Sequence, residues 1–309
     1  MTWTTFLQIV ELRTKIVSIS TFVLSGLSVY WIYGQMPWLL VVLLFFTVLA
    51  VDMGTTAFNT FFDFERGVDD ANTNQEADKV LIHRKTPSGY ALLAALALFA
   101  FAGVLGLFLA LWKGWPLLVL GIVSFFVAYR YSGGKTPLSA TPWGEFFAGL
   151  FLGSVLWLVV CFTLAPPSVP TPAWQPEFWT RHLLASLPSF FFIASILTVN
   201  NACDREGDRT SGRQTLSLAL GPRADLLIVL LPLAAYVTMI AQSLLELLPI
   251  GMTYAALLGL ALSIPIWRAM FERGFSHRTK GSNMGDVSRS FLIFTLFSGL
   301  GLFSGIVLR

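Results

Sequence analysis

The sequence predicts an all-α integral membrane protein, a single-domain bundle of nine transmembrane helices over residues 1–309. Of its residues 55% are hydrophobic and only 12% charged, whereas soluble domains carry about a quarter charged residues. The apolar residues also gather in stretches of about 17 to 25, the length that a helix needs to cross roughly 30 Å of hydrocarbon. Open β-structure is excluded because unpaired backbone groups cannot face lipid.

The apolar stretches can be placed in order along the chain. Arg13 and Lys15 precede the first, and no small-residue cleavage site follows it, so we expect a retained helix and no cleavable signal peptide. Cys161 and Cys203 lie in or beside apolar stretches of opposite parity in the helix count, one odd-numbered and one even-numbered, so we expect neither a disulfide nor a cysteine metal site. The nine expected spans are about 16–33, 38–60, 89–112, 115–131, 143–165, 181–201, 222–246, 250–271 and 289–308.

The basic residues predict the orientation of the bundle. With the N-terminus inside, only three of the 20 Lys and Arg residues fall on the outer side, namely Lys113, Arg181 and Arg309. Cytoplasmic loops carry such an excess of Lys and Arg, so we expect a cell (inner) membrane protein with a cytoplasmic N-terminus. The net charge of +3 therefore reports topology, and we expect no nucleic-acid partner. The inner loops are then 61–88, 132–142, 202–221 and 272–288.

Two of the inner loops begin with the same polar pattern at the end of a helix. One has Asn59-x3-Asp63, and the other has Asn200-x3-Asp204 followed by x3-Asp208. Spacing of four residues places such side chains on one face of a helix, one turn apart. Asn59 and Asn200 lie 141 residues apart, with four predicted helices between them. The pattern suggests a duplication that produced two related four-helix units.

The chemistry of these two loops favours a metal and a diphosphate. Uncompensated carboxylates are costly to bury in a membrane bundle, and oxygen ligands of this kind favour Mg²⁺. Basic side chains beside carboxylates and Mg²⁺ suit a diphosphate. The alternative is that the loops hold only solvated ion pairs, as many cytoplasmic loops do. The basic residues are Lys79, Arg84 and Lys85 in loop 61–88, and Arg205, Arg209 and Arg213 in loop 202–221.

One acidic residue lies deeper in the membrane. Asp52 precedes Asn59 by seven residues and Asp63 by eleven, offsets that return to within about 20° of the same helix face. An intramembrane Asp is a functional candidate by default, so we count Asp52 among the substrate-binding candidates. The alternative is a structural hydrogen bond to a Ser, Thr or Trp of a neighbouring helix.

Three stretches together resemble the UbiA superfamily of intramembrane aromatic prenyltransferases. They are "NTFFDFERGVD" (59–69), "YSGGKTPLSATPWGEFFAGLFLG" (131–153) and "NNACDREGDRTSGRQTLSLALG" (200–221). Within the superfamily they look most like the 1,4-dihydroxy-2-naphthoate polyprenyltransferases of menaquinone biosynthesis. The chain departs from the pattern at Thr60, where the family usually has the first Asp of its first motif. It also departs at "HRKTPSGY" (83–90), which matches the family's Arg-Pro-Leu segment only loosely.

The resemblance implies a Mg²⁺-dependent transfer of a polyprenyl group from its diphosphate to an aromatic acceptor, with the tail held in a cavity open to the bilayer. The inner-side loops 61–88 and 202–221 would cap the active site. Metal ligands would be Asn59, Asp63, Asp69, Asp204 and Asp208. Catalytic roles would fall to Asp63, Asp204, Asp208, Lys79 and Arg205. Substrate contacts would come from Asn59, Arg84, Lys85, Asn200, Asn201, Arg213, Tyr131 and Lys135.

Other functions are compatible with parts of this pattern. A transporter built from repeats would also place polar residues between its halves, but near the membrane midplane on broken helices. Here all of the polar candidates except Asp52 lie at the inner edge. A second alternative is a UbiA-superfamily enzyme with another acceptor, such as another aromatic, haem or a sugar phosphate, or a terpene cyclase. The Thr60 departure also leaves open a non-catalytic protein that binds a prenyl lipid.

Overall fold

The computed structural model describes residues 2–68, 80–83, 86–166 and 175–308. In this part of the chain nine helical spans are long and apolar enough to cross a membrane, which confirms the predicted number and order. The spans are Leu12–Tyr33, Trp38–Glu65, Gly89–Lys113, Trp115–Ser132, Gly144–Leu164, Pro176–Cys203, Leu216–Leu244, Gly251–Arg273 and His277–Val307.

Short helices and turns supplement the long ones. The helices are α1 (Trp3–Ile9), α2 (Ile16–Tyr33), α3 (Trp38–Glu65), α4 (Val80–His83), α5 (Gly89–Lys113), α6 (Trp115–Ser132), α7 (Gly144–Ala148), α8 (Leu156–Leu164), α9 (Pro176–Cys203), α10 (Arg205–Thr210), α11 (Leu216–Leu220), α12 (Leu227–Leu244), α13 (Gly251–Arg273) and α14 (Lys280–Val307). A π-helical stretch, Gly149–Val155, joins α7 to α8. Turns of 3₁₀-helix are Leu12–Lys15, Leu138–Ala140, Gly221–Leu226 and His277–Thr279.

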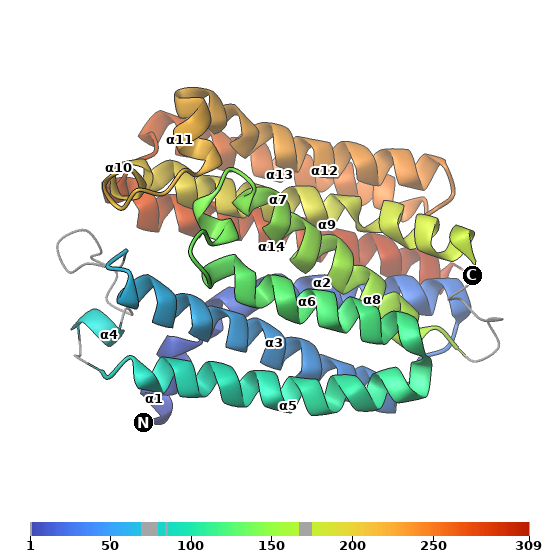
Figure 1. Cartoon of the computed structure of the whole chain (residues 1–309). Helices are drawn as coiled ribbons and strands as arrows, with labels where there is room; N and C mark the ends of the chain where they lie inside the picture. Colours follow the sequence, from blue (N-terminus) through green and yellow to red (C-terminus); the bar gives the residue numbers. More distant parts are fainter. Residues whose placement is uncertain (1, 69–79, 84–85, 167–174, 309) are drawn as a thin grey trace.

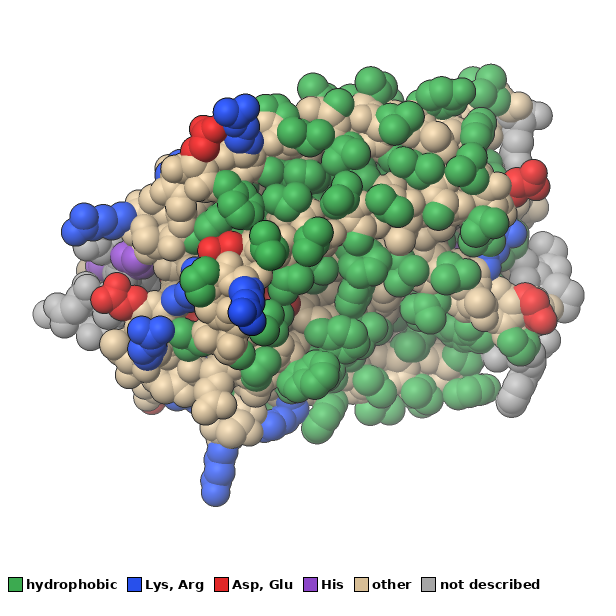
Figure 2. Space-filling model, turned by 90° about the horizontal axis from the view of Figure 1, so that it is seen from above, with side chains coloured by type: hydrophobic (Ala, Val, Ile, Leu, Met, Phe, Trp, Pro, Cys, Tyr) green, Lys and Arg blue, Asp and Glu red, His purple; other side chains and the backbone are tan. Residues whose placement is uncertain are grey.

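The long helices run side by side along one axis, and the short helices α4, α10 and α11 gather at one end of the bundle (Figure 1). Helix α3 packs on α5 and α6, and α9 packs on α8, α12 and α14. Helix α2 contacts α3, α8 and α14, which links the first helices of the chain to the last. Figure 2 shows a broad apolar surface along the helices, with charged side chains concentrated at the end that carries α10. This distribution suits a bilayer-spanning body with one polar cap.

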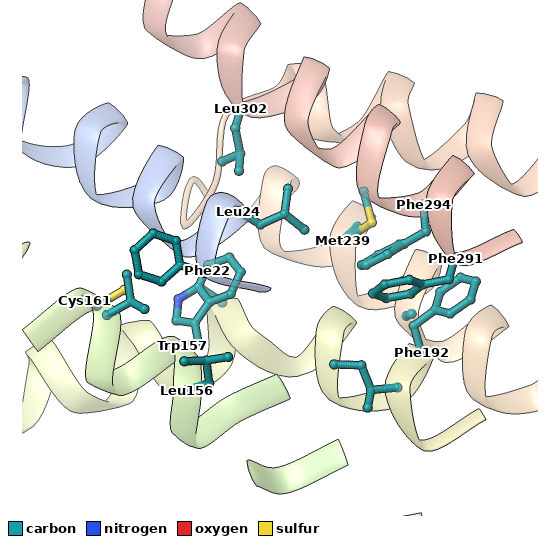
Figure 3. Close-up of a cluster of buried hydrophobic side chains, with 14 of the residues drawn as sticks. Phe22, Leu24, Leu156, Trp157, Cys161, Phe192, Met239, Phe291, Phe294 and Leu302 are labelled. Carbon is teal, nitrogen blue, oxygen red and sulfur yellow. The ribbon is translucent and has the colours of Figure 1, made fainter. Parts of the chain in front are cut away.

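Two clusters of buried apolar side chains hold the helices together. The larger joins α2, α8, α9, α12 and α14 through residues such as Phe22, Trp157, Phe192, Met239 and Phe294 (Figure 3). The smaller joins α1, α3, α4 and α5 through residues that include Ile9, Ala57, Phe58, Val80 and Ala95. Both clusters combine segments from distant parts of the sequence.

The π-helical stretch lies where the fifth span meets α9. A Cβ atom built on Gly149 would lie 2.6 Å from the carbonyl oxygen of Phe190, and one on Gly153 would lie 2.6 Å from the Phe190 Cα. Glycines four residues apart allow two membrane helices to approach this closely. The approach brings α7, which carries Glu145, against the end of α9 that carries the second polar motif.

The last span is longer than predicted. We expected it to begin at residue 289, but α14 begins at Lys280, so its first turns include residues assigned to loop 272–288. Polar side chains are tolerated there because they bond to the end of α13: Arg273 donates to Asn283 Oδ1 at 2.7 Å and to Asp286 Oδ2 at 2.8 Å. The expectation was wrong because apolar composition marks only the part of a helix that faces lipid.

Candidate active site

One cavity of about 1840 Å³ receives residues of both polar motifs. Asn59 and Asp63 reach it from α3, and Asn200, Asn201 and Asp208 reach it from α9 and α10. The same cavity continues along apolar side chains of α5, α6 and α8, among them Leu107, Leu118, Ile122, Phe125 and Leu156. The cavity therefore joins a polar end to a long apolar part. This arrangement suits an amphiphilic ligand with a charged head and an apolar tail.

The first motif lies at the end of α3. The Ser132 hydroxyl donates to Asn59 Oδ1 at 2.9 Å, which ties α3 to the end of α6. Asp63 is 8% exposed and lines the cavity. Soon after it the helix stops: the Val68 amide donates to the Asp63 carbonyl at 2.9 Å, and Gly67 has φ of +67°. This left-handed ending, which glycine permits, leaves Asp63 in the last turn of α3.

Thr60 does not face the cavity. Its hydroxyl donates to the Ile9 carbonyl of α1 at 3.1 Å, and the residue is only 5% exposed. The described residues that line the cavity include Asn59 and Asp63 but not Thr60. In this chain the position where the family usually has a carboxylate therefore anchors the N-terminal helix.

The second motif spans the junction of α9 and α10. Asn201 donates to Glu145 Oε1 of α7 at 2.8 Å, and both residues are buried. Asp208 accepts from the Thr215 hydroxyl at 3.1 Å, and Arg213 Nε lies 3.5 Å from its Oδ1. Burial raises the pKa of the Asp208 carboxyl above its ordinary value, an effect that Arg213 opposes and the neighbouring Asp204 reinforces. A nearby cation would therefore stabilise the charged form of Asp208.

Asp204 is paired with residues at the start of the last span. Lys280 Nζ lies 2.8 Å from Asp204 Oδ2, and His277 Nδ1 lies 3.8 Å from Oδ1. Both partners line the cavity. Sequence analysis missed them because neither belongs to a motif, and because α14 was expected to begin only at residue 289. Their one signal was their position in an inner loop rich in basic residues.

The glycine-containing loop after α6 is fixed between the two motifs. Arg66, just past α3, donates to the carbonyls of Ser132 and Gly134, each at 2.6 Å. On the other side, Arg213 donates to the Ser139 carbonyl at 2.9 Å, and the Gln214 amide donates to the Ala140 carbonyl at 2.9 Å. This loop is therefore the physical connection between the α3 motif and the α10 motif.

Asp52 also lines the cavity, in a buried polar cluster. Lys15 Nζ lies 2.8 Å from Asp52 Oδ1 and 2.5 Å from the Thr56 hydroxyl, and the Ser18 hydroxyl donates to Asp52 Oδ2 at 2.5 Å. The lysine is 1% exposed, and a buried charge of this kind persists only when it is paired. The cluster fastens the start of α2 to α3 at the cavity wall.

The remaining predicted residues have different positions. Tyr131 and Asn200 line the cavity. Lys135 is exposed, and among the described residues of the cavity lining neither Lys135 nor Arg205 occurs. Arg205 instead forms an ion pair with Asp225 and donates to the Ser217 carbonyl at 3.2 Å. Asp69, Lys79, Arg84 and Lys85 lie outside the described residues.

The residues at the polar end of the cavity fit a magnesium ion that is shared with a phosphate ligand. Asn59, Asp63, Asp204 and Asp208 offer oxygen donors to one space, and oxygen is the donor that Mg²⁺ prefers. Within the described part of the chain, no three His, Cys, Asp or Glu side chains converge closely enough to hold a metal by themselves. Mg²⁺ commonly keeps few protein carboxylates and completes its shell with phosphate and water, so an open arrangement of this kind suits it.

Comparison with known proteins identifies the family. The family model described as the UbiA prenyltransferase family matches residues 19–281. The chain belongs to this family. The resemblance predicted from the three sequence stretches is thereby confirmed.

One curated relative is 1,4-dihydroxy-2-naphthoate octaprenyltransferase of Bacillus subtilis (strain 168), to which this chain is 30% identical over 199 residues. That match covers 64% of this chain and 60% of the relative, so the chain spans three fifths of the relative's length. The aligned stretch is long enough to include several helices, and part of each chain lies outside the alignment.

Several solved structures share the fold of this chain. The apo structure of a UbiA homologue from Aeropyrum pernix K1 gives a TM-score of 0.67 at 18% identity, covering 94% of this chain and 98% of that one. A UbiA homologue from Archaeoglobus fulgidus, bound to DMAPP and Mg²⁺, gives 0.62 at 16% identity, covering 99% and 100%. A chain from a study of digeranylgeranylglyceryl phosphate synthase gives 0.66 at 18% identity, covering 97% and 98%.

Proposed function

We propose that this protein transfers a polyprenyl group from a polyprenyl diphosphate to an aromatic acceptor, 1,4-dihydroxy-2-naphthoate, in a Mg²⁺-dependent step of menaquinone biosynthesis. The observation that carries the proposal is that Asn59 and Asp63 face the same cavity as Asp204 and Asp208, and that this cavity runs on into an apolar space between the helices. A diphosphate head and an isoprenoid tail are the ligand for which such a space is suited.

The acidic residues of both motifs would hold the metal that accompanies the diphosphate. When bound, Mg²⁺ neutralises the diphosphate and helps pyrophosphate to leave. Asn59 and Asp63 would hold it from α3, and Asp204 and Asp208 from the junction of α9 and α10. Arg213, which lines the cavity 3.5 Å from Asp208, would stabilise the charge that develops on the leaving pyrophosphate.

The transfer itself is a substitution at an allylic carbon. The bond between this carbon and the diphosphate oxygen breaks, and its electron pair leaves with pyrophosphate. The π electrons of an electron-rich ring carbon form the new carbon–carbon bond. The ring then regains aromaticity by losing the group on that carbon, either a proton or, from a carbon that bears a carboxylate, carbon dioxide. The apolar cavity wall would exclude water, which would otherwise capture the allylic cation.

The naphthoate acceptor is supported by sequence similarity. The Bacillus subtilis relative that carries this activity in its name is 30% identical over 199 residues. The stretch 131–153 also resembles the naphthoate branch of the superfamily, and in the structure it supplies Tyr131 and Ser139 to the cavity wall. Tyr131 and Ser139 are the polar side chains that this stretch contributes to the cavity lining, among the described residues, and we assign them to the acceptor side.

The orientation follows from the positions of the basic residues. Arg213 and Lys280 lie at the same end of the cavity as the motifs, and charged side chains concentrate at that end of the molecule (Figure 2). Because Lys and Arg favour the cytoplasmic side of membrane proteins, we propose that this end faces the cytoplasm. Diphosphate and acceptor would then enter from the cytoplasm or from the inner leaflet of the cell membrane.

The test is a reconstituted transfer reaction. Purified protein in lipid nanodiscs is incubated with a long-chain polyprenyl diphosphate, Mg²⁺ and a panel of acceptors, which includes 1,4-dihydroxy-2-naphthoate and 4-hydroxybenzoate. We expect a prenylated 1,4-naphthalenediol (naphthoquinol) as the product with the first acceptor, and its loss when EDTA removes the metal. Product with another acceptor alone would disprove the naphthoate assignment, and no product with any acceptor would disprove prenyl transfer.

A further inference from the structure

The first residue of α14 supplies a cation to the second motif. Lys280 Nζ donates to Asp204 Oδ2 at 2.8 Å, and its side chain is 15% exposed. Both residues line the cavity, so the ion pair lies where a metal and a diphosphate would meet. The lysine thus forms an ion pair with a carboxylate that the proposed function assigns to a metal.

We infer that Lys280 is a diphosphate-binding residue that serves as the counter-cation of Asp204 until substrate arrives. This inference rests on the proposed function and adds to it a residue from the last helix. In the free protein the ammonium group neutralises Asp204. When metal and diphosphate bind, Lys280 releases Asp204 and donates to a phosphate oxygen.

The two carboxylates of the second motif each need a compensating cation. Asp204 and Asp208 are one helical turn apart, because the Asp208 amide donates to the Asp204 carbonyl at 2.8 Å, and like charges at this spacing repel. Each has its own basic partner: Lys280 contacts Asp204, and Arg213 lies beside Asp208. The protein itself therefore supplies one basic side chain beside each of these two carboxylates.

The two cations differ in the chemistry of their side chains. Arg213 also donates to the Ser139 carbonyl at 2.9 Å, so its planar guanidinium is fixed across two loops. Lys280 carries a compact charge on a flexible four-carbon stem and reaches Asp204 from another helix. A lysine of this type can move a few ångströms between a carboxylate and a phosphate without displacing the backbone. Lysine is also a common ligand of phosphate groups.

A purely structural role for the ion pair is less well supported by the contacts around it. The start of α14 is already fastened by Asn283, which donates to the Gly274 carbonyl at 2.9 Å and to Cys203 Sγ at 3.6 Å. Arg273 adds bonds to Asn283 and Asp286. Since α14 is joined to α13 and to the end of α9 by these contacts, the Lys280–Asp204 pair at the cavity is not needed to position it.

The inference predicts opposite effects on two ligands. In Lys280→Met, Asp204 loses its resident cation, so Mn²⁺ should bind about two- to fivefold more tightly when no diphosphate is present. Geranyl thiodiphosphate, a slowly reacting analogue, should bind about 10- to 100-fold more weakly, because a charge-assisted hydrogen bond is lost. If the Lys280–Asp204 pair only held two helices together, its loss would instead weaken the binding of both ligands.

The experiment measures Mn²⁺ binding by electron paramagnetic resonance and analogue binding by calorimetry, on full-length protein in nanodiscs. Arg278→Met is the matched control, because it removes the same charge two residues away from an exposed position outside the cavity lining. It should leave both affinities within about twofold of wild type, as expected for a screened surface charge. Lys280→Arg should retain analogue binding. If Lys280→Met does not fold, Lys280→Gln is measured in its place.

The outcomes separate this inference from the proposed function. Tighter Mn²⁺ binding with weaker analogue binding in Lys280→Met, both beyond the Arg278→Met control, supports the assignment. Unchanged analogue binding, or weaker binding of both ligands, overturns it while leaving prenyl transfer intact. Wild-type protein that binds neither Mn²⁺ nor the analogue overturns the proposed function and this inference together.

Discussion

The two polar motifs begin alike in sequence but differ in structure. Asn59 and Asp63 correspond to Asn200 and Asp204 by spacing. Beyond that point α3 ends, and the position that corresponds to Asp208 is Gly67, with φ of +67°. In the second motif a further helix, α10, continues for one more turn and carries Asp208 to the cavity. The α3 motif thus presents one carboxylate on its helix, whereas the second presents two.

The residue after each Asn shows a second difference. Thr60 donates to the Ile9 carbonyl and faces α1, whereas Asn201 lines the cavity and donates to Glu145. In both motifs this position contributes a hydrogen bond to a neighbouring segment of the fold. Shared spacing thus places side chains on one face of a helix end, while the surrounding helices decide which of them line the cavity.

The largest expected effect is the loss of either cavity carboxylate. Asp63→Ala and Asp204→Ala should each lower kcat for prenyl transfer by about 10³-fold or more, because each would remove a carboxylate that we propose holds the metal and so supports departure of the leaving group. Steady-state assays of product formation measure the loss. Asp225→Asn is the control, since Asp225 pairs with Arg205 and should retain nearly full activity. Near-normal turnover of one Asp variant would show that only the other motif binds the metal.

A smaller effect is expected on restoring the family's carboxylate at position 60. Thr60→Asp should not raise kcat, and it should lower the free energy of unfolding by about 2 to 4 kcal/mol, because the new group would be buried against the Ile9 carbonyl. Thermal unfolding in nanodiscs measures the destabilisation. Thr60→Val, which only deletes the hydroxyl, should cost about 1 kcal/mol. A large rate gain in Thr60→Asp would mean that this side chain can reach the metal.

The smallest effect separates two arginines of the same loop. Arg205→Ala should leave kcat and KM within about threefold of wild type, because Arg205 pairs with Asp225 away from the cavity and such partly exposed pairs contribute little. Arg213→Ala should lower kcat/KM for the polyprenyl diphosphate by about tenfold or more, as expected for a lost charge-assisted contact. An equal loss of kcat/KM in both variants would show that Arg205 also acts at the diphosphate site.

Much of the fold could be predicted from the sequence, because span length and hydropathy are local properties. The nine spans were predicted in the right order, and the two motifs were placed at helix ends that do meet at one cavity. The start of α14 was missed because Asn283 and Asp286 are polar yet paired with Arg273. Lys280 was missed with it, since no motif or spacing links residue 280 to residue 204.

The sequence by itself determined the membrane class, the family and the pair of Asn/Asp motifs, because these depend on composition and on spacing within single helices. Only the tertiary structure decided which side chains share the cavity. It turned Thr60 toward α1 and Arg205 toward Asp225, and it brought Lys280 to Asp204 across 76 positions of sequence. The physical reason is that a helix fixes the direction of a side chain, but the packing of other helices determines what lies in that direction.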